Sequence, residues 1–274
     1  MKKITVNSLS GGKTSSYLAT HYPADYNLFA LVHIEAKYCT PKDKKIVQMV
    51  SDKIGFEFIA TAESDKTLKV MLDLEQLIGR NIRWVCGLSF EKVIEKKKIL
   101  PNQMARFCTS EMKIQPIFDY CQKEIKDVVD MRIGFRYDER ERGEKNKDNT
   151  HFKTIVGKSS NGRNKWAEVE WRTNIFPLID NLIVNRDVIK WANQTNLDFP
   201  IDSNCVGCFW KPYQQLRKNW DDEPLKMRWF SEMETKIKAR FKKEMSYKDV
   251  KKLGLQGDFF FGTGSGCNSG YCTD

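Results

Sequence analysis

The chain has 274 residues, of which 41% are hydrophobic and 30% charged, and its formal net charge is +10. This composition excludes a chain that is disordered throughout, and no run of 18 apolar residues predicts a membrane span. The basic excess favours a polyanionic partner, either a nucleic acid or a highly phosphorylated small molecule, with solvated lysine-rich helix faces as the alternative. Because the start carries no secretory signal, we expect a cytoplasmic protein without a membrane partner.

Alternating strand and helix patterns run through the first half of the chain. Strands are expected over 3–9, 26–36, 56–61 and 127–135. Helices are expected over 13–22, 42–55, 67–79, 88–100 and 111–125, the last broken or started near Pro116. The segment 26–36 is almost wholly apolar, as expected for a strand buried on both faces of a parallel sheet. The alternation predicts an α/β fold with a parallel, Rossmann-like sheet flanked by helices.

The pattern changes after residue 140. Residues 140–151 are polar and expected to be mobile, and 150–173 are expected to form a hairpin with a flexible tip. Helices are expected over 185–196, with Asn185 as N-cap, and within 210–246. The predicted domains are a nucleotide-binding domain carrying the hairpin as an insertion and a helical, cysteine-bearing carboxy-terminal region, over 1–180 and 181–274.

A glycine-containing loop follows the first expected strand, in the stretch NSLSGGKTSS. Glycines at this place let backbone N–H groups approach an anion, and the start of the next helix adds partial positive charge. The four residues that a Walker motif needs before its Gly-Lys are missing, and an ordinary glycine turn is the alternative. The residues expected to hold a nucleotide here are Ser10, Gly11, Gly12, Lys13, Thr14 and Ser15.

The loop resembles the SGGxxS motif of the PP-loop, or adenine nucleotide α-hydrolase-like, superfamily. A second stretch, RFCTSEMKIQP, sharpens this resemblance. Its Cys108, Lys113 and Pro116 match the first cysteine, the lysine and the proline of the sulfonucleotide reductase signature Cys-Cys-x-x-Arg-Lys-x-x-Pro. Thr109 and Met112 depart from it, and this altered form resembles the DNA phosphorothioation sulfurtransferases and their phage-borne relatives. Lys113 can neutralise phosphate or sulfate oxygens, while Cys108 is either a thiolate ligand or a small core residue.

A CxxC pair, Cys205 and Cys208, brings two sulfurs together through an internal glycine. Alone, such a pair can be a redox dithiol, half a zinc site or part of an iron–sulfur site. Resemblance to the assimilatory reductases implies a four-iron, four-sulfur [4Fe-4S] cluster held by this pair and Cys108. Cys272 is the expected fourth ligand, with Cys267 as the second choice. Zinc held by the same cysteines is the alternative, since thiolates suit both metals.

The segment GFRYDERER resembles the Gly-Ile-Arg-x-Asp-Glu segment of the reductase family, matching it at Gly134, Arg136, Asp138 and Glu139. Arg136 would hold a phosphate or an adenylate and Asp138 would belong to the nucleotide site. A charged loop with surface ion pairs is the alternative. Glu35, at the end of the second expected strand, is expected near the ribose or adenine, because ligands bind at the carboxyl ends of parallel strands.

Together these motifs imply a PP-loop iron–sulfur enzyme related to phosphoadenosine phosphosulfate (PAPS) reductases. The chain ends in GYCTD and lacks the Glu-Cys-Gly-Leu-His motif of the thioredoxin-linked reductases. We therefore expect sulfur transfer to an acceptor adenylated with ATP, with Lys113 and Arg136 stabilising developing charge. The acceptor is expected to be DNA or RNA, served by a sulfur-donating partner protein. The alternatives are a reductase that releases sulfite from PAPS and a zinc-stabilised nucleic-acid-binding module.

Overall fold

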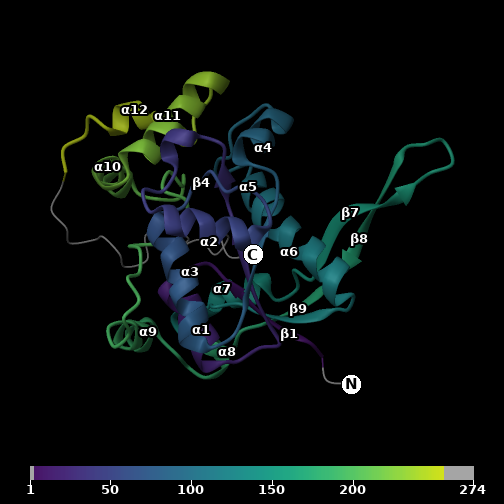
Figure 1. Ribbon diagram of the computed structural model, residues 1–274. Coiled ribbons are helices and arrows are strands. Elements are labelled where there is room, and N and C mark those ends of the chain that lie inside the picture. The colour runs from purple at the N-terminus through teal and green to yellow at the C-terminus, as the bar shows by residue number, and fades with distance from the viewer. Residues whose placement is uncertain (1–2, 256–274) are drawn as a thin grey trace.

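The computed structural model describes residues 3–255, and its centre is a five-stranded parallel sheet (Figure 1). The sheet has the order β5-β2-β1-β6-β9. Its strands are β1 (Thr5–Leu9), β2 (Tyr26–Leu31), β5 (Ile82–Cys86), β6 (Val129–Arg132) and β9 (Arg172–Ile175). All four pairings within it are parallel. The predicted α/β class with a parallel sheet is thereby confirmed.

Helices cover both faces of this sheet, as the apolar run of β2 requires. On one face, Phe29 and Leu31 pack with residues of α1 (Lys13–His21), α2 (Lys44–Ile54) and α3 (Asp65–Ile78). On the other face, Leu28 and Ala30 pack with α6 (Gln115–Tyr120). Alternate β2 side chains thus enter two different cores, because successive side chains of a strand point to opposite faces.

The local start and stop signals of the helices act as the sequence indicates. The side chains of Asp43, Ser64 and Ser89 cap α2, α3 and α4 (Phe90–Lys97) by accepting backbone N–H groups. Gly55 and Gly79 end α2 and α3 in the left-handed conformation that glycine adopts without strain. The predicted end of the second helix at Gly55 is confirmed.

The helix that carries Cys108 is continuous through Pro116, contrary to the expected break. It runs through α5 (Phe107–Thr109), the π-helical turn η2 (Ser110–Ile114), α6 and a second π-helical turn, η3 (Cys121–Ile125). Pro116 lacks an N–H and stands in the first turn of α6, directly after the wider η2 turn. A π-turn already interrupts the regular ladder of hydrogen bonds, so the proline is accommodated without ending the helix.

Two strand assignments differ from expectation. Within 56–61 only Ala60–Thr61 forms a strand, β4, and it pairs antiparallel with β3 (His33–Ile34) outside the main sheet. The neighbour of β2 is instead β5, which follows α3 and which the sequence patterns did not single out. Residues expected to be mobile after 140 form α7 (Arg140–Asn146), preceded by the short turn η4 (Tyr137–Glu139).

The expected hairpin is present and projects from the body of the molecule (Figure 1). Its strands are β7 (His151–Lys158) and β8 (Asn164–Glu170), paired antiparallel. The main sheet then continues with β9, followed by α8 (Pro177–Asp180) and α9 (Asn185–Ala192). Asn185 is the first residue of α9 and Val184 is its N-cap, so the predicted cap was wrong by one position.

The carboxy-terminal helices share a core with the first half of the chain. They are α10 (Tyr213–Asp222), α11 (Pro224–Ile237) and α12 (Tyr247–Val250), so the expected helical segment 210–246 ends at residue 237. Trp229 and Phe230 of α11 pack in one cluster with Phe90 of α4 and with residues of β3, β4 and η1 (Lys37–Cys39). Among residues 3–255, no helix has both the length and the apolar character needed to cross a membrane.

Candidate functional site

The loop predicted to bind phosphate joins the end of β1 to the start of α1. Gly11 has a φ of +73°, so the chain turns sharply here without strain. The Ser15 hydroxyl fixes the turn, because it accepts the Ser10 N–H at 3.2 Å and donates to the Gly12 carbonyl at 3.1 Å. Within the described chain no side chain caps α1, which leaves the positive end of its dipole and its first N–H groups to an anion.

Two other segments pack closely against the glycines of this loop. A Cβ added at Gly11 would lie 2.5 Å from Thr67 Cγ2, and one added at Gly12 would lie 2.9 Å from Ser203 Oγ. The hydroxyls of Ser203 and Ser10 are also 3.2 Å apart. Gly11 therefore needs glycine, because its positive φ and the Thr67 contact both disfavour a Cβ, and the loop is held between α3 and the segment that carries Ser203.

Arg136 reaches the same loop from the end of β6. Its Nη1 donates to the Thr14 hydroxyl at 3.0 Å, and its Nε donates to Asp138 Oδ1 at 3.2 Å. Asp138 Oδ1 also accepts the Asn185 N–H at 3.2 Å, which ties the turn to α9. Gly134 completes the approach, since a Cβ there would lie 3.5 Å from the Ser15 backbone. Arg136 thus contacts the loop directly, whereas Asp138 orients Arg136.

Three cysteines from two distant segments line one small cavity. Cys108 comes from α5, and Cys205 and Cys208 come from the turn before α10; the cavity that they share has a volume of about 40 Å³. Burial raises the pKa of Cys108 to about 11 and also raises the pKa of Cys205 and of Cys208. The predicted fourth ligand, Cys272, and the second choice, Cys267, lie outside the described residues.

The chemistry of these donors suits a soft metal centre. Thiolates are the ligands of iron–sulfur clusters and of structural zinc. Among residues 3–255, no three His, Cys, Asp or Glu side chains are spaced so that they share a single metal ion. A metal centre in this cavity is therefore supported by the chemistry of the three thiols and not by their spacing.

Lys113 adds a positive charge beside the thiols. Its side chain lines the cysteine cavity, and its Nζ lies 3.2 Å from Oε1 of Glu63, whose side chain is 0% exposed. Burial lowers the pKa of Lys113, but the charges of Glu63 and Cys205 outweigh burial and raise it. Burial raises the pKa of Glu63. Lys226 Nζ donates to the Glu63 backbone carbonyl at 2.5 Å, which fixes this residue between α11 and the cysteine-bearing helix.

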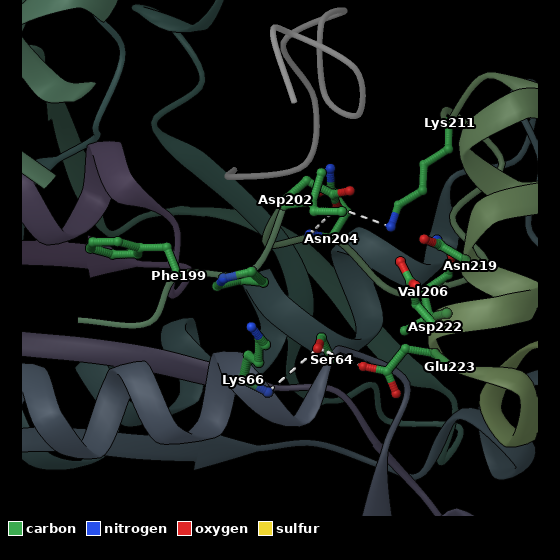
Figure 2. Close-up of a pocket in the computed structure, with 12 residues that line it drawn as sticks. Ser64, Lys66, Phe199, Asp202, Asn204, Val206, Lys211, Asn219, Asp222 and Glu223 are labelled. Carbon is green, nitrogen blue, oxygen red and sulfur yellow. Dashed lines mark hydrogen bonds and ion pairs between the residues drawn. The ribbon is translucent and has the colours of Figure 1, made fainter. Parts of the chain in front are cut away.

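A larger cavity of about 360 Å³ is lined by residues of α3, of the segment 199–211 and of α10 (Figure 2). Its walls mix apolar and charged side chains, among them Ser64, Lys66, Phe199, Asp202, Lys211 and Glu223. Lys211 Nζ lies 3.0 Å from Asp202 Oδ1, with both side chains largely buried. Lys66 and Asp202 directly neighbour in sequence the residues that pack against the loop, Thr67 and Ser203. The cavity wall therefore includes the chain neighbours of both residues that contact the loop, and its volume is that of a small-molecule pocket.

Glu35 and Lys13 are less closely tied to these contacts. Glu35 follows β3, which is outside the main sheet, so it does not stand at the end of a central strand as the sequence suggested. Its carboxylate accepts the Ser89 hydroxyl at 2.8 Å and pairs with Lys92 at 3.0 Å, and these contacts hold its pKa below the usual range. Lys13 is the first residue of α1. A role of either residue toward a nucleotide stays a prediction.

Sequence reasoning missed several residues at this site. Ser203, Glu63 and the Asp202–Lys211 pair belong to no motif, because each acts through a contact that only the fold creates. A further pair, Cys86 and His33, joins the ends of β5 and β2–β3, with 2.9 Å between Cys86 Sγ and His33 Nδ1. Its two members are 53 positions apart, which gives no spacing signal.

Compared with protein-family models and with curated proteins, the sequence matches none.

Proposed function

We propose that this chain is a PAPS-reductase-like PP-loop enzyme that binds an adenine nucleotide and transfers sulfur to an acceptor that it adenylates. The nucleotide phosphates would lie on the loop formed by Ser10, Gly11, Gly12, Thr14 and Ser15. One observation carries the proposal: the segment whose Ser203 contacts this loop also supplies Cys205 and Cys208 to the cavity of Cys108. A nucleotide loop and a three-thiol cavity are thus joined by a few residues of chain.

The side chains around the loop support phosphoryl chemistry. Arg136 is aimed at Thr14 by Asp138 and can stabilise the charge that develops on the α-phosphate. An acceptor oxygen would attack that phosphorus and release pyrophosphate, which gives an adenylated acceptor. Sulfur from a donor would then replace the adenylated oxygen and release AMP. The larger cavity, with Lys66 and Lys211 on its walls, has room for part of the nucleotide or acceptor.

The cysteine cavity supports a metal cofactor in this proposal. Cys108, Cys205 and Cys208 would hold a [4Fe-4S] cluster, with Cys272 or Cys267 as the fourth ligand and zinc as the alternative. A cluster at this place would supply or hold sulfur. Lys113 offsets the negative charge that builds up when the thiols are deprotonated to bind metal.

Turnover of two substrates by anaerobically purified protein tests the reaction. Release of AMP and pyrophosphate from ATP supports the proposal, whereas release of sulfite from PAPS with a reductant makes the chain a sulfonucleotide reductase. Arg136→Met is expected to weaken ATP binding about tenfold, since a charge-assisted contact contributes about 1.5–3 kcal/mol. Arg186→Met is the matched control, because that side chain is 89% exposed on α9.

Metal and sulfide analysis tests the cofactor separately. Iron and acid-labile sulfide in the wild type, both lost in Cys205→Ser and Cys108→Ser, are the expected result. Cys39→Ala is the control, since Cys39 is buried in the core by η1 and does not line the cavity. Zinc without iron would make the centre structural and would remove the cluster from the proposal.

A further inference from the structure

The hairpin of β7 and β8 forms an arm that stands clear of the rest of the molecule (Figure 1). Its base is anchored by Phe152, whose ring lies 4.8 Å from Phe118, which in turn lies 5.6 Å from Trp171. Beyond this anchor the arm makes little contact with the body, and every residue over 155–166 is exposed. At about 3.3 Å per residue, the six residues from 155 to the tip extend roughly 20 Å.

The outer part of the arm carries charge of one sign, whereas the part nearer its base also carries Glu168 and Glu170. Residues 153–167 contain Lys153, Lys158, Arg163 and Lys165 and no aspartate or glutamate. All four basic side chains are exposed, and Lys153 lies opposite Glu168 in the ladder. Lys158 and Lys165 lie opposite Asn164 and Gly157 instead, and within residues 3–255 neither they nor Arg163 form an ion pair. Exposed cations without internal partners are available to a polyanion, and the arm concentrates them where another molecule can reach them from both sides.

Apolar side chains lie among these charges. Ile155 and Trp166 are directly opposite each other in the ladder, 46% and 57% exposed. Val156, 48% exposed, sits at a bulge between Ile155 and Gly157, where the register shifts and the ribbon bends. No residue between 3 and 255 covers this patch, although burying an exposed tryptophan is favourable.

We propose that this arm binds duplex DNA by inserting into the major groove. A two-stranded antiparallel ribbon fits a groove about 12 Å wide and 8.5 Å deep, and the reach of the arm exceeds that depth. Lys158, Arg163 and Lys165 would contact phosphates on the groove walls, while Trp166 and Ile155 would contact sugars and thymine methyl groups. The major groove of A-form RNA is too narrow and deep for such a ribbon.

The arm would bring the acceptor of the proposed sulfur transfer to the enzyme, and in that sense it deepens the proposed function. Its evidence is independent of the nucleotide loop and of the cysteines. DNA binding is therefore measured without ATP and without turnover. A negative result would refute the arm proposal alone, because sulfur transfer is tested by its own assay.

Fluorescence anisotropy with a labelled 20-base-pair duplex, measured across a salt series, tests the proposal on the full chain. The triple variant Lys158→Ala/Arg163→Ala/Lys165→Ala is expected to bind roughly 500-fold more weakly near 0.1 M salt, since each phosphate contact contributes about eightfold there. Its slope of log K against log salt should fall by nearly 3. Trp166→Ala should weaken binding about tenfold and leave that slope unchanged.

The control variant Lys44→Ala/Lys45→Ala/Lys69→Ala removes three exposed lysines of α2 and α3 and the same total charge. It should bind DNA nearly as the wild type does. Both triple variants should keep the wild-type melting temperature, because none of the substituted side chains packs in a core. Equal weakening by the two triples would reduce the effect to net charge and overturn the assignment of the arm.

Two further measurements can also overturn it. Tighter binding of single-stranded DNA or of duplex RNA than of duplex DNA would be inconsistent with a ribbon in the major groove. Sedimentation that shows a dimer in the wild type and a monomer in Trp166→Ala would assign the apolar patch to a second copy of the chain instead.

Discussion

Replacing Lys113 by methionine should strongly destabilise the protein, because it leaves the Glu63 carboxylate buried without its nearest positive charge. Glu63 is 0% exposed, its Oε1 lies 3.2 Å from Lys113 Nζ, and its Oε2 has no hydrogen-bond partner among the described residues. Removal of one member of such a buried pair costs about 3–5 kcal/mol. At about 2–4 °C per kcal/mol for a chain of this size, the melting temperature should fall by about 10 °C.

A double-mutant cycle tells whether this cost comes from the pair or from lost packing. Glu63→Gln alone should cost about 2–4 kcal/mol, since Lys113 then loses its buried partner. The double variant should cost only about 1–2 kcal/mol, so that the coupling between the two sites is about 3 kcal/mol or more. Urea unfolding of the three variants and the wild type, with unchanged m values, measures these differences. Strictly additive single costs would refute the pairing as a source of stability.

Three further predictions follow from backbone geometry and burial. Gly11→Ala should lower the free energy of unfolding by about 3 kcal/mol, because Gly11 has a positive φ and a Cβ there would meet Thr67. Gly79→Ala should lower it by about 1 kcal/mol, because Gly79 also has a positive φ but open space around it. Equal shifts in the melting temperatures of the two variants would contradict this. Tyr247→Phe removes the 2.9 Å hydrogen bond to the Gly207 carbonyl and should cost about 1 kcal/mol in urea and speed amide exchange of Cys208, whose N–H belongs to the same peptide group; unchanged exchange would argue against it. Burial raises the pKa of Glu234, so the unfolded carboxyl ionises first, and wild-type stability should fall relative to Glu234→Gln as the pH rises above about 4.5; a stability difference that grows in favour of the wild type would be the wrong sign.

Local chemistry made much of the fold predictable. The strand before Ser10, the cap at Gly55 and the hairpin over 150–173 follow from periodicity and from residues that tolerate special backbone angles. The order of strands was harder to predict. Residues 56–61 alternate like a strand, but Phe56 is 45% exposed and only Ala60–Thr61 pairs, because β5 takes the place beside β2. Which strand fills that place depends on packing across the sheet and leaves no local signal.

At the candidate site, too, short sequence motifs were predictable and long-range contacts were not. The Ser10 loop, Arg136 and the cysteine motifs were visible as short patterns, and the fold brings Arg136 to the loop and Cys108 to the CxxC pair. Glu63 and Ser203 were not visible, since their contacts join residues 50 and 193 positions apart. Glu35 was expected at a central strand end, but the chain leaves the sheet at Leu31 and forms β3 before reaching it.

The short chain between Ser203 and Cys205 has a thermodynamic consequence. Two residues of backbone span at most about 7 Å, and Val206 is fastened to Ala62 by a 2.7 Å hydrogen bond. If an anion entering the glycine turn shifted the backbone at Ser203, the neighbouring Cys205 would have to move or this tether would be strained. Binding at the loop would then alter the affinity of the cysteine cavity for its ligand, and linkage would make that influence equal in both directions.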